Sequence, residues 1–256
     1  MNNLIWDDVL ILGDSFTKQR FKDYDWPKIV AKRITGLNPQ HDFPVRGIGF
    51  SGASWWATRK LLINELQKHK PKVLILTHTE MQRIPSDQDY GLNSASVFNT
   101  DHYAEGAKHR LKEENLCPLE VLLAGQEYYK HLFSKDFHLW CQQSWFEELD
   151  RILDHHQIEK VIHFHTFNPW DKQKLFIFRN GITFDKPLWP ISDDHAIMSS
   201  TATFTKVSDN LTVPNADMWA KNPTRNHFTS ENNIKLADLI CRNLENYNNG
   251  LRTLDF

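Results

Sequence analysis

The stretch from Asp8 to Thr17 reads DVLILGDSFT, and it decides the fold class of this chain. Its first half contains a short run, Val9–Leu12, in which every side chain is apolar, and its second half is a polar turn that opens with a glycine. Successive side chains of a strand point to opposite faces of a sheet, so an entirely apolar run is typical of a strand covered on both sides. The stretch therefore predicts a central strand of a parallel sheet with a polar turn at its carboxyl end.

Strand and helix patterns alternate along the rest of the chain. Apolar runs of strand length recur at Lys72–Thr77 and Lys160–His165, and a short extended segment between them and the first strand reaches Val45–Gly52. Four patterns with helix-start signals accompany them. They are Trp26–Ile34, Ser54 to about Lys68, a helix opened by the capping-box pair Ser144 and Glu147, and a last helix that starts at Thr229 or Ser230. This order predicts an α/β fold in which right-handed crossovers join parallel strands and helices cover both faces of the sheet.

Two long stretches, at about 80–140 and 168–222, show little periodicity, and we interpret them as irregular insertions, the first partly helical. A chain of 256 residues is long enough to bury one sizeable core. The sequence thus predicts a single domain over residues 1–256 that carries both insertions.

The composition narrows the classes of partner. The 30 basic and 32 acidic residues give a net charge of −2, which argues against a protein-wide electrostatic grip on nucleic acid. No apolar run approaches the ~20 residues of a spanning helix, and the amino terminus has neither a basic flank nor an apolar signal core. The three cysteines lie far apart and form no CxxC pair. We therefore expect a soluble cytoplasmic protein that binds neither nucleic acid nor a membrane.

Chemistry in an open parallel sheet is expected beyond the carboxyl ends of its strands, where this chain has polar turns. In the first turn, Ser15 follows a buried strand, Gly13 and Asp14. Its hydroxyl can be held at the sheet edge, and its own N–H group can help to hold an oxyanion. The alternative is that Asp14 or Ser15 only satisfies backbone groups of the loop.

Three further turns add candidate groups. Gly47–Ser54 precedes a helix, and we interpret it as an oxyanion-donor loop or a plain tight turn. A nucleotide site is a third interpretation, although no GK[ST] motif follows the glycines. Thr77–Glu80 offers hydroxyls, an imidazole and a carboxylate at a strand end, or is a solvated loop mouth. His227 precedes the last helix, where it acts as a general base or has a structural role.

Taken in order, these blocks resemble the SGNH (GDSL-type) hydrolase superfamily, most specifically in VLILGDSFT at residues 9–17 and GFSGAS at residues 49–54. The resemblance covers the scaffold, roughly Asp8–Thr79 and Val161–Leu244, and leaves out both insertions. It implies a flavodoxin-like three-layer α/β/α sandwich with about five parallel strands. It also implies an esterase, lipase, thioesterase or carbohydrate O-deacetylase that uses no metal and no other cofactor.

By position, the resemblance makes Ser15 the nucleophile and His227 the general base. The N–H groups of Ser15 and Gly52 would hold the oxyanion, with Thr79 standing where the family has an asparagine donor. Asp14 belongs to the first block and Glu80 to the third. We count both, together with Gly52 and Thr79, as oxyanion-holding or substrate-binding residues.

The chain departs from the family pattern at two points. A threonine hydroxyl at position 79 replaces an amide donor. Thr224 stands where the family's last block has an aspartate that orients the histidine. Either the enzyme is slow, or a backbone carbonyl, Glu80 or Asp217 takes over the orienting role.

Two other features each have a structural and a functional interpretation. His163 and His165 alternate on one predicted strand and share a face, as packed histidines or as part of a zinc site. The tryptophans, among them Trp170, Trp189 and Trp219 in the second insertion, close loops over the core or stack on sugar rings or bases.

The sequence therefore predicts a serine-dependent hydrolase that cleaves an ester of a small molecule or a glycan, with O-acyl groups on carbohydrates as one substrate class. The first alternative is a catalytically weakened protein of the same fold that binds a ligand with its strand-end pocket and aromatic insertions. The second is transfer of the acyl group to an alcohol in place of water.

Overall fold

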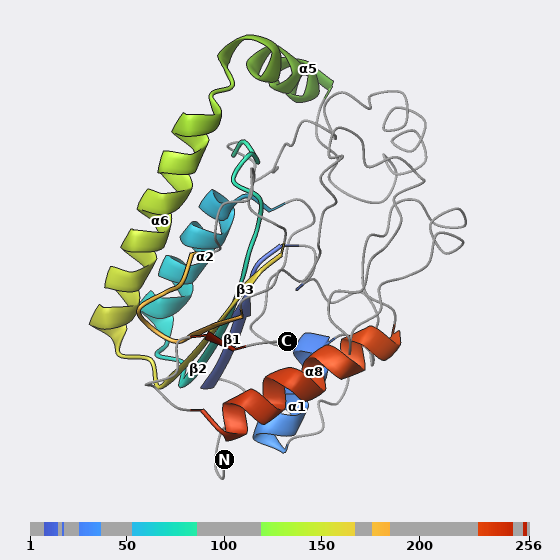
Figure 1. Cartoon of the computed structure of the whole chain (residues 1–256), viewed down its shortest axis with the longest axis vertical. Coiled ribbons are helices and arrows are strands. Elements are labelled where there is room, and N and C mark those ends of the chain that lie inside the picture. The colour runs from blue at the N-terminus through green and yellow to red at the C-terminus, as the bar shows by residue number, and fades with distance from the viewer. Residues whose placement is uncertain are drawn as a thin grey trace.

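A computed structural model of the chain describes residues 8–14, 17, 26–36, 53–85, 119–166, 176–184, 230–247 and 253–254. The described strands form one parallel sheet, in which each strand lies beside the strand that precedes it in the chain (Figure 1). In order across the sheet they are β1 (Val9–Leu12), β2 (Val73–His78), β3 (Lys160–His165), β4 (Ile182–Phe184) and β5 (Thr253–Leu254). The α/β class and the parallel sheet predicted from the sequence are confirmed.

Helices pack on both faces of this sheet. Helices α1 and α8 cover one face and α2 and α6 cover the other, while α5 lies near the amino-terminal end of α6 (Figure 1). The helices are α1 (Trp26–Thr35), α2 (Trp55–Lys68), α5 (Leu119–Glu127), the short π-helix η2 (Tyr128–Leu132), α6 (Lys135–His156) and α8 (Ser230–Glu245). None of these helices is both long enough and apolar enough to cross a membrane.

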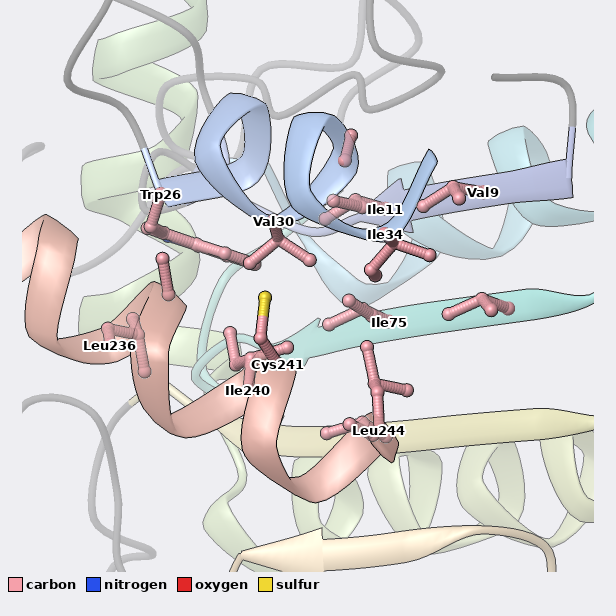
Figure 2. Packing of buried hydrophobic residues seen from close by; sticks show 14 of the residues in the cluster. Val9, Ile11, Trp26, Val30, Ile34, Ile75, Leu236, Ile240, Cys241 and Leu244 are labelled. Atoms are coloured by element: carbon pink, nitrogen blue, oxygen red, sulfur yellow. The ribbon is translucent and has the colours of Figure 1, made fainter. Parts of the chain in front are cut away.

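One continuous apolar cluster joins the sheet to α1 and α8 (Figure 2). Odd-numbered side chains of the first two strands, such as Ile11 and Ile75, pack there with Val30 of α1 and Ile240 of α8, and all four are fully buried. Helices α1 and α8 therefore each turn their apolar side to the sheet, as the spacing of their apolar residues predicts.

A second apolar cluster covers the opposite face. Even-numbered side chains, among them Leu12 and Leu76, pack with Leu62 of α2 and Leu149 of α6, and all four are fully buried. Burial on both faces explains why β1 and the first four residues of β2 are apolar at every position, as is typical of parallel sheets covered by helices.

Gly13 packs directly against Thr77, where β1 ends beside β2. A Cβ atom at this position would lie 1.7 Å from Thr77 Oγ1 and 3.0 Å from the Thr77 carbonyl oxygen, so no larger residue fits without displacing the backbone. The glycine therefore lets the chain leave β1 directly beside the end of β2, and this positions the polar turn that begins at Asp14.

Most of the predicted elements agree with the structure. The predicted strands that end at Leu12, Thr77 and His165 are confirmed, the second with a shift of one residue. Helix α1 begins at Trp26 as predicted. Ser54 is the N-cap of α2, since its hydroxyl oxygen accepts a 3.3 Å hydrogen bond from the Ala57 amide.

The predicted start of the helix before β3 is wrong. The capping-box pair Ser144 and Glu147 lies in the middle of α6, which begins at Lys135 with Ser134 as its N-cap. Residues 135–156 contain no glycine or proline. Nothing in the sequence therefore prevents the helix from beginning before Ser144.

The second stretch predicted to be irregular contains part of the sheet. Residues Ile182–Phe184 form β4, which pairs in parallel with β3 and with β5. All three residues are buried, and a strand of this length shows no periodicity that a sequence pattern could reveal.

Candidate functional site

The carboxyl ends of β1, β2 and β3 meet at one edge of the sheet, and polar residues follow each of them. Asp14 comes after β1, Thr79 and Glu80 come after β2, and Thr166 comes after β3. The Thr166 amide donates a 2.8 Å hydrogen bond to the His78 carbonyl oxygen, which continues the pairing past the end of β3. Ligands of open parallel sheets bind at this edge, which makes it the candidate functional site.

The turn after β1 closes on the carbonyl oxygen of Asp14. Thr17 donates to this oxygen from its amide at 3.0 Å and from its hydroxyl at 2.8 Å. Both residues are fully buried. The main chain is therefore held at Asp14 and Thr17, the residues that flank Ser15 and Phe16 in the sequence.

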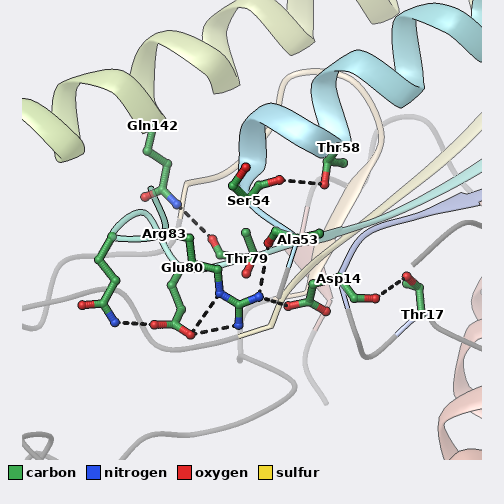
Figure 3. Close-up of polar contacts among 10 residues, drawn as sticks. Asp14, Thr17, Ala53, Ser54, Thr58, Thr79, Glu80, Arg83 and Gln142 are labelled. Carbon is green, nitrogen blue, oxygen red and sulfur yellow. Dashed lines mark hydrogen bonds and ion pairs between the residues drawn. The ribbon is translucent and has the colours of Figure 1, made fainter. Parts of the chain in front are cut away.

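Arg83 connects the turns at this edge (Figure 3). Its guanidinium donates to the Ala53 carbonyl oxygen at 3.2 Å and to Glu80 Oε1 at 3.0 Å, and its Nη1 lies 3.9 Å from Asp14 Oδ2. Ala53 follows Gly52 in the sequence and directly precedes the N-cap of α2. One arginine therefore contacts the turn after β1, the turn before α2 and the turn after β2.

These charges are almost completely removed from solvent. The side chains of Arg83, Glu80 and Asp14 are 5%, 11% and 0% exposed. Buried charges are tolerated when they are paired, and the arginine hydrogen-bonds to Glu80 and lies within ion-pair distance of Asp14. With both carboxylates ionised, the group carries one net negative charge.

Buried hydroxyls without partners gather at the same edge. The side-chain oxygens of Thr77, Thr79 and Thr166 are buried and have no hydrogen-bond partner among the described residues. A buried hydroxyl left unpaired costs about 1–3 kcal/mol. Thr79 lies in the same cluster as Arg83 and Ala53 (Figure 3). A ligand oxygen that accepted a hydrogen bond from it would remove this cost.

Helix side chains hold the main chain of the loop after β2. Three loop carbonyl oxygens each accept a hydrogen bond: that of Thr79 from Gln142 at 3.2 Å, that of Met81 from His138 Nδ1 at 3.0 Å, and that of Gln82 from Tyr129. Burial raises the pKa of the Tyr129 hydroxyl, so it stays protonated and remains a donor. The loop that carries Glu80 and Arg83 is thus fixed by η2 and by the first turns of α6.

Three buried histidines lie on the sheet face covered by α6. His163 Nε2 donates to the Asn180 carbonyl oxygen at 2.8 Å, and His165 Nε2 donates to the Phe176 carbonyl oxygen at 3.0 Å. Because a carbonyl oxygen only accepts, Nε2 of His163 carries the proton and its Nδ1 accepts from His78 Nε2 at 3.0 Å. His163 and His165 are therefore packed strand histidines.

Burial also keeps these three imidazoles neutral. It lowers the pKa of His163 to about 3 and that of His165 to about 4, and it lowers the pKa of His78 well below its usual value. In the described part of the chain, no group of three or more His, Cys, Asp or Glu side chains could hold a metal ion.

The structure brings three of the predicted site residues, Asp14, Thr79 and Glu80, to one edge. Glu80 there accepts hydrogen bonds from Arg83 and Gln82. The other predicted site residues, Ser15, Gly52 and His227, lie outside the described residues, as do Thr224, Asp217, Trp170, Trp189 and Trp219.

Sequence reasoning missed two residues of this edge, Arg83 and Thr166. Thr166 directly follows the predicted strand Lys160–His165, and the rule that strand ends face the site could have found it. Arg83 lies in a stretch predicted to be irregular, and its only sequence signal is a basic residue close to Glu80.

Comparison with known proteins adds no relative, since no protein-family model, no curated protein and no solved structure matches the chain. The basis for a functional proposal is therefore the order of the motifs and the geometry of the strand ends.

Proposed function

We propose that this chain is a serine-dependent hydrolase of the SGNH type with a flavodoxin-like three-layer α/β/α fold. In this proposal it cleaves an ester bond, and O-acyl groups on carbohydrates are the substrate class that we favour. Ser15 is the nucleophile and His227 is the general base.

The observation that carries the proposal is the meeting of three motif segments at one edge of the sheet. Asp14, Ala53 and Glu80 lie far apart in the sequence, yet Arg83 bonds to the last two and lies 3.9 Å from the first. They come from the same three blocks that resemble the SGNH superfamily. This convergence supports the proposal because the chemistry needs a nucleophile and its oxyanion donors side by side.

The proposed reaction has two halves. Ser15 Oγ attacks the carbonyl carbon of the ester while His227 takes the hydroxyl proton. The bond to the alkoxy oxygen then breaks, His227 gives its proton to the departing alcohol, and the acyl group stays on the serine. Water then attacks the acyl carbon while His227 takes one of its protons, the bond to Ser15 Oγ breaks, and His227 returns the proton to this oxygen as the acid leaves. The N–H groups of Ser15 and Gly52 and the hydroxyl of Thr79 hold the oxyanion, each donor contributing about 10²-fold.

A fluorophosphonate probe tests the proposal, because it forms a covalent bond with an activated serine. We expect the wild type to be labelled, Ser15→Ala to be unlabelled, and His227→Ala to be labelled at least about 10²-fold more slowly. Ser144→Ala is the matched control, since this serine lies within α6, and it should keep the wild-type rate. Labelling that persists in Ser15→Ala, or a wild type that is not labelled, would contradict the proposal.

One observation favours the second candidate, a ligand-binding protein of the same fold. Both described carboxylates at this edge, Asp14 and Glu80, face Arg83, an arrangement that suits a binding site with no need of an orienting acid. For a binding protein we expect an O-acetylated sugar to raise the melting temperature of wild type and Ser15→Ala equally, with no release of acetate. Acetate release that depends on Ser15 would exclude it.

A further inference from the structure

We propose that Arg83 is a positioning residue of this site, holding Asp14 and Ala53, the chain neighbours of Ser15 and Gly52, in fixed relation to each other. The inference rests on the proposed function. Arg83 contacts no reacting atom in the proposed mechanism. It acts through Asp14, which precedes Ser15, and through Ala53, which follows Gly52.

The nitrogens on the two sides of the guanidinium have different binding partners. Nε and Nη2 bind Glu80 Oε1 at 3.4 and 3.0 Å, which fixes the arginine within its own loop. Nη1 points the other way, toward the Ala53 carbonyl oxygen at 3.2 Å and Asp14 Oδ2 at 3.9 Å (Figure 3). Only a planar fork with five donors makes all of these contacts from one position, and the ammonium of a lysine has no such geometry.

The arginine is itself held in a rigid frame. Its loop is bonded to α6 and η2 through the carbonyl oxygens of Thr79, Met81 and Gln82. The frame extends from the helices through Arg83 to the two turns. Positioning of this kind has a large effect on rate, because a displacement of about 1 Å at the reacting groups costs about 10²-fold.

Arg83 also sets the charge of the site. It balances one of the two buried carboxylates that it faces, Asp14 and Glu80. Replacing the arginine by a neutral residue makes this group more negative by one charge, and that change would raise the pKa of the general base of the proposed mechanism by favouring its protonated form. The proposed base, His227, should therefore respond to changes at Arg83.

The experiment compares Arg83→Lys with Arg59→Lys, using the second-order rate constant of fluorophosphonate labelling. Arg59 is a matched control because two of its nitrogens also donate to one carboxylate, that of Glu148, at 2.8 and 2.6 Å. This pair joins α2 to α6 and not the turns at the strand ends. Each substitution keeps the charge and loses the fork. We expect Arg83→Lys to be labelled about 10²-fold more slowly and Arg59→Lys to stay within about twofold of the wild type.

The pH profile of labelling separates positioning from simple loss of structure. Arg83→Met removes the positive charge, so the midpoint of the profile should move to higher pH. Glu80→Gln keeps the shape of its side chain and serves if the methionine variant fails to fold. It removes a negative charge, so its midpoint should move to lower pH, and labelling should slow because the arginine loses its anchor.

Each result decides between the two claims. A wild-type rate in Arg83→Lys, together with labelling that depends on Ser15, overturns the positioning role and leaves the proposed function standing. Equal slowing in Arg83→Lys and Arg59→Lys, or midpoints that do not move, also overturns it. A wild type without Ser15-dependent labelling overturns the proposed function and this inference together.

Discussion

Thr79 combines a stability cost with a proposed role in binding. Its buried hydroxyl has no partner in the described part of the chain. We expect Thr79→Val to raise the free energy of unfolding by about 1 kcal/mol, because the isosteric valine leaves no hydroxyl unpaired. The same change should slow fluorophosphonate labelling about 10²-fold, because the oxyanion loses a donor. Urea denaturation and labelling kinetics measure the two effects.

Thr58→Val provides the contrast. The Thr58 hydroxyl donates to the Ser54 carbonyl oxygen at 3.4 Å, so its loss removes a bond that exists in the folded protein. This variant should be less stable than the wild type and keep its labelling rate. If Thr79→Val also lost stability, the hydroxyl would have a partner, and the proposed donor role would fail.

Motif order allowed Asp14, Thr79 and Glu80 to be placed together from the sequence, because the ends of parallel strands share one edge. Arg83 could not be placed in the same way. Its contacts depend on how far a long side chain reaches across three turns, and residue spacing does not encode that reach. Ala53 was not predicted either, because its contribution is a backbone oxygen.

The start of α6 is a second testable feature. Ser134 caps this helix by accepting a 3.3 Å hydrogen bond from the Phe137 amide, whereas Ser144 lies inside it. Loss of an N-cap side chain costs about 1 kcal/mol. We therefore expect Ser134→Ala to lower the free energy of unfolding by about that amount and Ser144→Ala to change it little. Chemical denaturation of both variants distinguishes the observed start from the one predicted by the capping box.

The contrast between α6 and the strands shows what local patterns determine. A capping box indicates that a helix can begin at Ser144. It does not indicate whether the residues before Ser144 are themselves helical. The apolar runs at Val9–Leu12 and Val73–Leu76 were predictable because two covered faces leave no polar position in them. Strand β4 was not, because three residues are placed by their partners and not by their own pattern.

The folded protein should lose stability in mild acid through its buried histidines. Burial lowers the pKa of His163 to about 3 and of His165 to about 4, and it lowers that of His78 well below 6.5. Above pH 6.5 both the folded and the unfolded chain hold these imidazoles neutral, so they add no pH dependence. As the pH falls below that value, only the unfolded chain takes up protons, and the free energy of unfolding drops by up to about 1.4 kcal/mol per pH unit for each histidine.

Urea denaturation across this pH range measures the effect. His165→Gln should reduce the slope by up to about 1.4 kcal/mol per pH unit, because the proton of this imidazole is no longer linked to unfolding. His131→Gln is the comparison, since this histidine is 68% exposed, and it should change the slope far less. A slope that His165→Gln leaves unchanged would mean that His165 is already protonated in the folded protein.

The order of the strands bears on how the protein is made. Every described strand pairs with the strand that precedes it in the chain, from β1 to β5. On the ribosome, each newly emerging strand therefore meets a neighbour that has already been synthesised, and none of them has to be inserted between two others. The growth of the described sheet thus follows the direction of translation, and its last addition waits until Thr253 and Leu254 have been synthesised.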